Sequence, residues 1–359
     1  MVKRFAGMSA ARTLLDWYDG NRRRLPWRAP PGTRADPYHV WLSEVMLQQT
    51  TAAVVARYFA RFLDRFPSIA ALAGAEESEV LALWAGLGYY ARARNLHRAA
   101  FHVARSGALS SDPVELAKLP GIGTYMAAAI AAIAFDVPVV PVDGNVARVL
   151  ARRHAVLAPM PRAMGEIRGL ASRLTADPAV AARPGDFAQA LFDLGATVCK
   201  PADPDCARCP WREGCLGHEA GIAETLPRKA LKKPRPQRYG AHFWLTDGAG
   251  RVLLRRRPSA GLLGGMTELP GTEWRGRPFS RPAALAAAPM QAGWRTLGVV
   301  RHGFTHFTLH ITLYGAAVPV IAAAGFLRAK DALAAEALPS VMRKCCDLAE
   351  RTLTGRLAA

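Results

Sequence analysis

Acidic residues are scarce in this chain of 359 residues, and the scarcity is uneven. The sequence has 28 Asp and Glu against 47 Lys and Arg, which gives a formal net charge of +19. Residues 1–220 hold 26 basic and 20 acidic residues, a difference of +6, whereas residues 221–359 hold 21 and 8, a difference of +13. Such an excess favours a polyanion such as nucleic acid, although an Arg- and Ala-rich proteome would also produce a basic protein.

Long apolar runs are missing as well. No run approaches the length of a membrane-spanning helix, and the basic stretch MVKRFAGMSAARTLLDWYDG lacks the apolar core of a secretory signal. We therefore expect no membrane partner. The hydrophobic content of 51% is ample for packed cores, and the length predicts two domains.

Cysteine is rare outside one cluster, CKPADPDCARCPWREGC, in which four cysteines are spaced C-x6-C-x2-C-x5-C. In a chain without signs of secretion, this pattern favours a metal site over disulfides. The spacing alone leaves zinc and an iron–sulfur cluster open, although structural zinc sites usually pair two CxxC motifs and this segment has one. The adjacent Cys345 and Cys346 are predicted to be packing thiols. The candidate ligands are Cys199, Cys206, Cys209 and Cys215.

The first 220 residues have the apolar periodicity of helices, with few β-branched alternations. DPYHVWLSEVMLQQT predicts a helix that Asp36 caps and Pro37 begins. LPGIGTYMAAAI sets Gly121 and Gly123 in a tight turn before an apolar helix, where backbone N–H groups are able to bind a phosphate. A helix–turn–helix corner without a ligand would have the same pattern.

The composition changes after residue 220. RKALKKPRPQR (228–238) has six basic residues and two prolines, which indicates an exposed linker. AHFWLTDGAGRVLLRRR predicts a β-hairpin, FTHFTLHITLYGAAV a strand, and RAKDALAAEALP a helix. The predicted organisation is a mainly α domain over 1–220, a basic linker over 221–238 and an α+β domain over 239–359.

The cysteine spacing, directly after a helical region, resembles the iron–sulfur loop of the endonuclease III superfamily of DNA glycosylases. LPGIG, between VELAKLP and an Ala-rich helix, resembles the helix–hairpin–helix of that superfamily. The resemblance implies a 4Fe–4S cluster bound by the four cysteines, and a hairpin that holds one DNA phosphate without reading sequence. Tyr125 stands where strand-cleaving members carry a lysine, so covalent amine catalysis is excluded at that position.

Further motifs narrow the resemblance to adenine DNA glycosylases of the MutY type. They are LPWR, SEVMLQQT, GLGYYARARNL, VDGNV and FAQALFDLGATVC, and with LPGIG they run through most of the chain. The resemblance implies hydrolysis of the N-glycosidic bond of adenine mispaired with 8-oxoguanine or guanine in duplex DNA, as part of base excision repair. It also implies a bacterial, cytoplasmic and nucleoid-associated monomer that leaves an abasic site.

Breaking this bond requires a proton for the leaving base and an anion beside the sugar cation. Glu44 lies off the apolar stripe of its helix, where a solvated carboxylate is the ordinary interpretation. Asp143 precedes a predicted helix and is placed to cap it, a role compatible with facing a pocket. The resemblance implies that Glu44 protonates adenine, that Asp143 stabilises the C1′ cation, and that Tyr125 and Asn145 line the pocket and orient Asp143.

A base inside a duplex has to be extruded before this chemistry, and another group has to enter the stack. Gln49 lies on the extension of the apolar stripe, an unusual place for an amide unless it bonds the helix end. The resemblance implies that Gln49 and Tyr89 enter the stack, and that Gln189 and Arg28 contact the flipped adenine.

GLLGGMTELPGTEW resembles the start of a Nudix-type domain. A hydrolase of that fold next needs an acidic helix to hold magnesium, but the sequence has no carboxylate from Arg275 to Met290. We therefore predict a domain that recognises its ligand and does not hydrolyse it.

Three histidines four residues apart, at 302, 306 and 310, would suggest a metal site on a helix, but their segment has the composition of a strand. FTHF resembles the loop with which the family senses 8-oxoguanine, with Phe304, Thr305 and His306 as its readers. Threonine stands there in place of the usual serine.

Two other functions fit parts of the sequence. An endonuclease III-like glycosylase/lyase for oxidised pyrimidines would share the hairpin and the cysteine loop, but Tyr125 and the C-terminal domain argue against it. A catalytically inactive DNA-binding protein would not require both Glu44 and Asp143.

Overall fold

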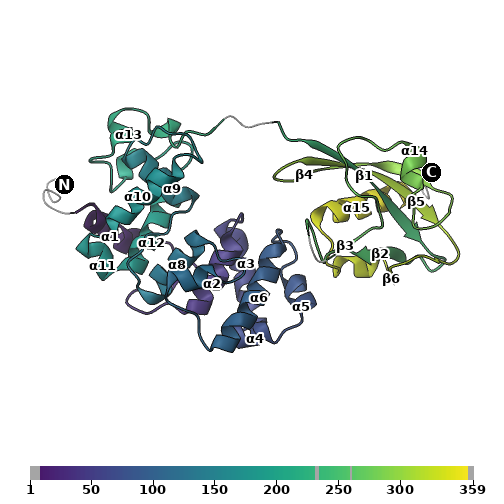
Figure 1. Ribbon diagram of the computed structural model, residues 1–359, viewed down its shortest axis with the longest axis horizontal. Coiled ribbons are helices and arrows are strands. Elements are labelled where there is room, and N and C mark those ends of the chain that lie inside the picture. The colour runs from purple at the N-terminus through teal and green to yellow at the C-terminus, as the bar shows by residue number, and fades with distance from the viewer. Residues whose placement is uncertain (1–8, 231–233, 259–260, 355–359) are drawn as a thin grey trace. The chain divides into compact units, whose positions relative to one another are not determined.

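The computed structural model describes residues 9–230, 234–258 and 261–354 (Figure 1). The chain forms two compact units, one made of residues 1–77 and 94–231, the other of residues 78–93 and 232–359. Within the described residues, no helix is long and apolar enough to cross a membrane.

Residues 9–220 are mainly helical, as their periodicity predicts. The α-helices are α1 (Ala10–Asn21), α2 (Pro37–Leu47), α3 (Ala52–Arg65), α4 (Ile69–Ala73), α5 (Glu77–Leu83), α6 (Ala91–Ser106), α7 (Pro113–Ala117), α8 (Thr124–Phe135), α9 (Gly144–Arg153), α10 (Met164–Leu174), α11 (Pro178–Ala182), α12 (Pro184–Asp193) and α13 (Leu216–Glu219).

Helix α2 begins as the sequence predicts. The Asp36 carboxylate accepts from the backbone N–H groups of Tyr38 and His39, and Pro37 takes the first helical position. The predicted apolar stripe is buried. The helix ends at Leu47, however, so Gln49 lies in the turn after it and not on an extension of the stripe.

Helices α7 and α8 form the predicted helix–hairpin–helix. Gly121 in the turn has φ +80°, and a Cβ there would lie 2.6 Å from the Asn95 Cβ, so both conformation and space require glycine. Gly123 is the N-cap of α8, and open space surrounds its Cα. Seven of the twelve residues of the apolar α8 are buried, so the helix that follows the turn is anchored in the core.

After α12 the chain passes through a π-helical turn (Leu194–Val198), the cysteine segment with a 3-10 turn (Cys206–Arg208), α13, and a second 3-10 turn (Ala223–Thr225). The next residues still pack on the helical unit. Leu226 is buried, and the Met160 N–H donates to the Arg228 carbonyl at 2.8 Å. Strand β1 then begins at Gln237. The predicted linker is therefore in contact with the helical unit at its start and in the sheet at its end.

The second part of the chain contains a mixed sheet. The predicted hairpin forms from β1 (Gln237–Thr246) and β2 (Val252–Arg256), which run antiparallel. The central pair β1 and β5 is parallel along ten residues, and the strand order is β3-β2-β1-β5-β4, with β6 beside β2. The other elements are β3 (Thr267–Glu268), α14 (Arg281–Leu285), β4 (Arg295–Gly303), β5 (Thr308–Ala317), β6 (Phe326–Arg328), a 3-10 turn (Asp331–Ala334) and α15 (Ser340–Thr354).

Strand β1 shows the two-residue period of a strand covered on both faces. Trp244 packs in a cluster with residues of α15, whereas Phe243 and Leu245 pack in a second cluster with Ala284 of α14. In Figure 1, the long helix α15 lies along the sheet. The predicted α+β fold is therefore confirmed, with a hydrophobic core on each side of the sheet.

Two local predictions in this part are wrong. RAKDALAAEALP forms only the 3-10 turn Asp331–Ala334, and the segment ends at Pro339, which lacks the N–H that a continuing helix would need. The helix lies instead at Ser340–Thr354. The strand predicted from Phe304 begins only at Thr308, because residues 304–307 form a turn that the Phe304 N–H closes by donating to the Phe307 carbonyl.

Candidate active site

A cleft of about 1030 Å³ opens among α2, α8, α9, α12 and the loop between α1 and α2. Its size suits one nucleotide of a larger ligand. The residues that the sequence analysis nominates for catalysis and base contact lie together in this cleft, although the two most distant of them are 161 positions apart in the chain. They are Arg28, Glu44, Gln49, Tyr125, Asp143, Asn145 and Gln189.

Glu44 is buried, with 6% of its surface exposed, so the solvated carboxylate expected from helix statistics is wrong. The Tyr125 hydroxyl donates a hydrogen bond of 2.7 Å to Glu44 Oε2. Burial raises the pKa of Glu44 to about 7, and the negative charge of Asp143 adds to the rise, whereas the Tyr125 bond and the Arg28 charge oppose it. Glu44 is therefore able to carry a proton near neutral pH.

Asp143 caps α9, as the sequence predicts, and also lines the cleft. One carboxylate oxygen accepts from the Val146 N–H at 2.7 Å, and the other accepts from Asn145 Nδ2 at 3.1 Å. Burial raises the pKa of Asp143, while these bonds and the Arg148 charge favour its anion. Fixed donors and a helix N-terminus hold an anion where a sugar cation would form.

Asn145 is itself held by Arg148, which sequence reasoning did not single out. Arg148 donates to Asn145 Oδ1 at 2.9 Å, to the Gly195 carbonyl at 2.7 Å and to the Cys199 carbonyl at 2.8 Å. Because Arg148 is 8% exposed, each of these bonds lies out of water. The network connects the Asp143 carboxylate to the start of the cysteine segment.

Arg28, nominated as a contact to adenine, is held by Asp193 at the end of α12. Arg28 Nη1 and Nη2 donate to the two carboxylate oxygens at 2.6 and 2.8 Å, and Arg23 pairs with the same carboxylate. Asp193 is fully buried, and sequence reasoning missed it. A carboxylate inside the apolar run ALFDLGATV was the available signal, because an unpaired charge is costly there.

Gln49 and Tyr89, nominated to enter the base stack, share an uncommon backbone conformation. Gln49 has φ +56° and Tyr89 has φ +48°, and both side chains are exposed. Left-handed conformations of large residues are costly and collect at functional sites. The Arg92 guanidinium supports the second loop, since it donates to the Leu87 and Gly88 carbonyls and stacks on the Tyr89 ring at 5.7 Å.

The four predicted metal ligands, Cys199, Cys206, Cys209 and Cys215, line one small cavity and form no disulfide. In the described part of the chain, no three His, Cys, Asp or Glu side chains converge on a point that would hold a single metal ion. Four thiols around one cavity are a donor set that is able to hold either zinc or an iron–sulfur cluster.

Arg152 of α9 lies fully buried against this cavity. Its guanidinium donates to the carbonyls of Lys200, Pro201 and Leu226, and to Cys199 Sγ at 3.3 Å. A cation beside the thiolates offsets part of their charge.

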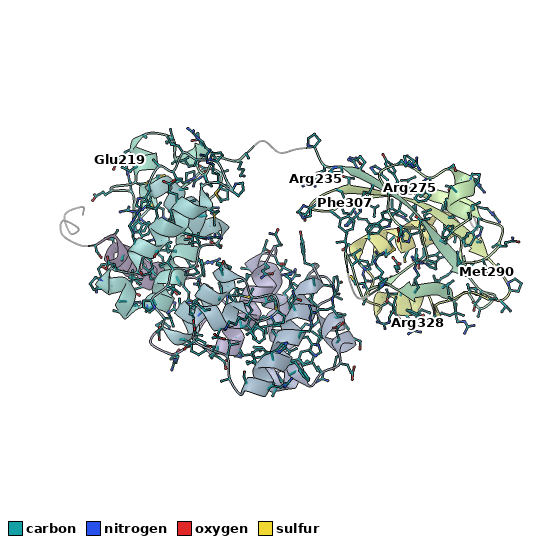
Figure 2. All side chains as sticks on the ribbon, in the orientation of Figure 1. Glu219, Arg235, Arg275, Met290, Phe307 and Arg328 are labelled. Carbon is teal, nitrogen blue, oxygen red and sulfur yellow. The ribbon has the colours of Figure 1, made fainter. Side chains whose placement is uncertain are left out.

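The FTHF segment is the turn between β4 and β5. Phe304 packs against Trp274 and Phe307, with ring centroids 5.7 and 4.8 Å apart, and Figure 2 labels Phe307 in this turn. Thr305 and His306 are exposed at its tip. Of the three predicted readers, Phe304 therefore anchors the turn, whereas Thr305 and His306 are exposed, with Thr305 Oγ1 3.2 Å from the Tyr89 hydroxyl.

Comparison with known proteins agrees with this arrangement. Residues 42–168 match the family model of the HhH-GPD superfamily base excision DNA repair proteins, and residues 241–348 match that of the NUDIX domain. The chain is 37% identical to the adenine DNA glycosylase of Homo sapiens, over 85% of this chain and 66% of that protein. It is 36% identical to that of Rattus norvegicus, over 86% of this chain and 70% of that protein. The chain belongs to the adenine DNA glycosylases.

Relatives of the same name occur in bacteria. The adenine DNA glycosylase of Buchnera aphidicola subsp. Baizongia pistaciae is 35% identical, over 70% of both chains. Among solved structures, a thermostable thymine-DNA glycosylase matches with a TM-score of 0.51 and 27% identity, over 58% of this chain and 95% of that one. Membership of the adenine DNA glycosylases and the combination of helix–hairpin–helix and Nudix-like folds, both expected from the motifs, are thus confirmed.

Proposed function

We propose that this adenine DNA glycosylase removes adenine paired with 8-oxoguanine or guanine, with Glu44 as general acid and Asp143 as the stabiliser of the sugar cation. The observation that carries the proposal is a pair of carboxylates in one cleft, Glu44 buried and Asp143 half-buried, which differ in surroundings. Glu44 lies in an apolar site that favours its proton, and Asp143 accepts bonds that favour its charge. Two acids with separated roles are what N-glycosidic hydrolysis requires.

In this mechanism the extruded adenine enters the cleft, and Glu44 donates its proton to a ring nitrogen as the bond to C1′ breaks. The Asp143 anion stabilises the resulting cation as adenine leaves with the proton from Glu44. Water then adds to C1′, and the Glu44 carboxylate takes up the proton that this water loses. Gln189, half-buried on α12, and Arg28 hold the base. Tyr125 offers a hydroxyl and no amine, so the product is an abasic site in an uncut strand.

We propose that Cys199, Cys206, Cys209 and Cys215 bind a 4Fe–4S cluster. The all-thiol donor set, the shared cavity and the adjacent Arg152 support this assignment. When bound, the cluster would fix the shape of a basic loop beside DNA. Reconstituted protein should show the broad absorbance of such a cluster, and serine at any of the four positions should weaken it.

Thr305 and His306 are proposed to read 8-oxoguanine opposite the adenine, which the exposed tip of the turn supports. A hydroxyl and an imidazole are able to bond the extra N–H and carbonyl of the damaged base. Thr305→Ser should preserve the preference for 8-oxoguanine, whereas Thr305→Val, which keeps the shape and removes the hydroxyl, should reduce it.

We further propose that a monomer acts on chromosomal DNA in the bacterial cytoplasm, because one lesion requires one cleft. Gel filtration with light scattering, at the protein concentration of the excision assay, checks the monomer.

The deciding experiment is single-turnover excision on a duplex with adenine opposite 8-oxoguanine, scored with and without hot alkali, beside a thymine glycol duplex. We expect adenine loss with strand breakage only after alkali. Direct nicking at thymine glycol with adenine untouched would replace the proposal by an endonuclease III-like activity.

A further inference from the structure

Asp193 is a buried carboxylate that the proposed chemistry does not use. It has no exposed side-chain surface, and it accepts from Arg28 through both terminal nitrogens, from the Arg23 guanidinium and from the Arg23 backbone N–H at 3.0 Å. A carboxylate with this many donors remains charged, and these bonds hold its pKa below the ordinary value in spite of burial. Two cations thus share one anion at the wall of the cleft.

Arg28 is the member of this group that faces the chemistry. It is 6% exposed in its side chain and lines the cleft together with Glu44. A guanidinium has five N–H groups, and three of them are bonded to Asp193 and to the Arg23 carbonyl. Asp193 therefore fixes the plane of Arg28 and leaves two N–H groups for a ligand.

The charge of Arg28 also acts on Glu44. The groups that face Glu44 are the Tyr125 hydroxyl from α8, the Asp143 carboxylate at the start of α9 and the Arg28 guanidinium from the loop before α2. A cation near a general acid stabilises its carboxylate and so favours loss of the proton that the acid has to donate. The anion of Asp193 offsets the Arg28 charge at bonding distance.

We propose that Asp193 is a positioning residue that orients Arg28 toward the base and offsets part of the Arg28 charge beside Glu44. Asp193 does not touch the substrate. It acts through Arg28, so removal of its charge should change the pH at which the reaction stops. This inference rests on the proposed role of Glu44 as general acid.

The test is the pH profile of single-turnover adenine excision by the full chain. Wild-type activity should fall with rising pH as Glu44 ionises. In Asp193→Asn the uncompensated Arg28 charge should move this fall to lower pH, by about one pH unit. Arg28→Gln should move it to higher pH, because the cation that favours the Glu44 carboxylate is then removed.

The double variant Arg28→Gln/Asp193→Asn separates this role from simple packing. Because this variant has neither the Arg28 nor the Asp193 charge, the pH at which activity falls should return close to its wild-type value, although the rate itself stays low. Asp193→Glu, which keeps the charge, should leave the profile at its wild-type position.

Glu268→Gln is the matched control, since Glu268 is also a buried carboxylate between two arginines, Arg255 and Arg257, but lies in the sheet. It should lower the thermal midpoint without moving the profile.

An Asp193→Asn profile that coincides with the wild type would overturn the inference and leave Glu44 as the acid. If Asp193→Asn does not fold, an unmoved profile in Arg28→Gln would overturn it instead. A wild-type rate that does not depend on pH would overturn the role of Glu44 and this inference together.

Discussion

Glu44 shows at the scale of one residue how burial converts an ordinary carboxylic acid into a proton donor for neutral pH. In water its proton would be lost near the ordinary value of about 4.3. In the protein, Glu44 of α2 is removed from solvent by packing against α8, and the Asp143 charge lies in the same cleft. The pKa of Glu44 therefore rises to about 7. The carboxyl group of Glu44 is therefore partly protonated near neutral pH.

Glu44→Gln should bind duplex with adenine opposite 8-oxoguanine as tightly as the wild type but lose excision by a factor of about 10²–10⁴, the usual contribution of a general acid. The glutamine keeps the shape and a partner for Tyr125, and only the proton is missing. Single-turnover rates and gel-shift affinities measure the two effects. Glu166→Gln on the exposed surface of α10 is the control and should change neither. Equal losses of binding and excision would contradict a purely chemical role.

Tyr125→Phe should shift the pH profile in the direction opposite to Asp193→Asn. The Tyr125 hydroxyl stabilises the Glu44 anion and lowers its pKa, so removal of the hydroxyl raises that pKa above its present value. Glu44 would then remain protonated to higher pH, and excision would fall off later as pH rises. The pH dependence of the single-turnover rate checks this.

Tyr38→Phe is the control for Tyr125→Phe. Tyr38 is buried, and its hydroxyl donates to the Phe66 carbonyl at 2.9 Å, outside the cleft. Its removal should lower stability and leave the profile in place. A profile shift of the same size in both variants would contradict the direct bond as the cause.

At the scale of elements, the site depends on where helices begin and end. Asp143 is able both to cap α9 and to present an anion to the cleft, because a helix N-terminus needs a capping acceptor and favours a negative charge. Gln49 follows the end of α2, and Gly121 and Gly123 precede α8. Residues at these ends have free backbone groups or uncommon dihedral angles, whereas the helix interiors supply rigidity.

Gly121→Ala should weaken DNA binding and lower stability, whereas Gly123→Ala should affect stability much less. At Gly121 the left-handed φ alone costs an alanine about 1–2 kcal/mol, and the new Cβ would overlap Asn95. Gly123 has an ordinary φ and open space around it. Thermal midpoints and affinity for undamaged duplex compare the two variants. Equal destabilisation would show that loss of a glycine, and not the geometry of the turn, is responsible.

At the scale of the whole molecule, the residues proposed for excision and those proposed for lesion reading lie on different parts of the chain. The cleft is built wholly from residues of the helical unit, and the FTHF turn belongs to the sheet. The segment around 234–236 joins them, with prolines at both ends of the triplet. Proline-rich segments are extended and semi-rigid, so they limit the volume that a tethered domain explores.

Insertion of about 20 Gly and Ser residues at Pro234–Pro236 should slow excision opposite 8-oxoguanine several-fold and leave excision opposite guanine nearly unchanged. A longer flexible tether lowers the effective concentration of the reading domain at the lesion. The ratio of the two single-turnover rates measures the effect. Insertion of the same length in the exposed loop at Gly276, within the sheet domain, is the control. An unchanged ratio would mean that the tether does not limit lesion reading.

Much of this architecture could be inferred from the order of residues along the chain, because it depends on local chemistry. The apolar period of three to four residues indicates helices, the glycines of LPGIG require a tight turn, and Asp36 and Asp143 cap the helices that follow them. The absence of carboxylates from Arg275 to Met290 predicts a domain that does not hydrolyse nucleotides. Tyr125 in place of lysine limits the chemistry before any coordinate is known.

Folding decided what depends on distant neighbours. Glu44 has the pattern of a solvated helix residue, and only packing against α8 buries it beside Tyr125. Asp193 lies 165 positions from Arg28, and their pairing exists only because α12 ends against the loop before α2. The network from Asp143 through Arg148 to Cys199 likewise arises where α9 meets the cysteine segment. Burial and long-range charge pairing set the pKa of the proposed acid, and both are properties of the packed chain that no local pattern specifies.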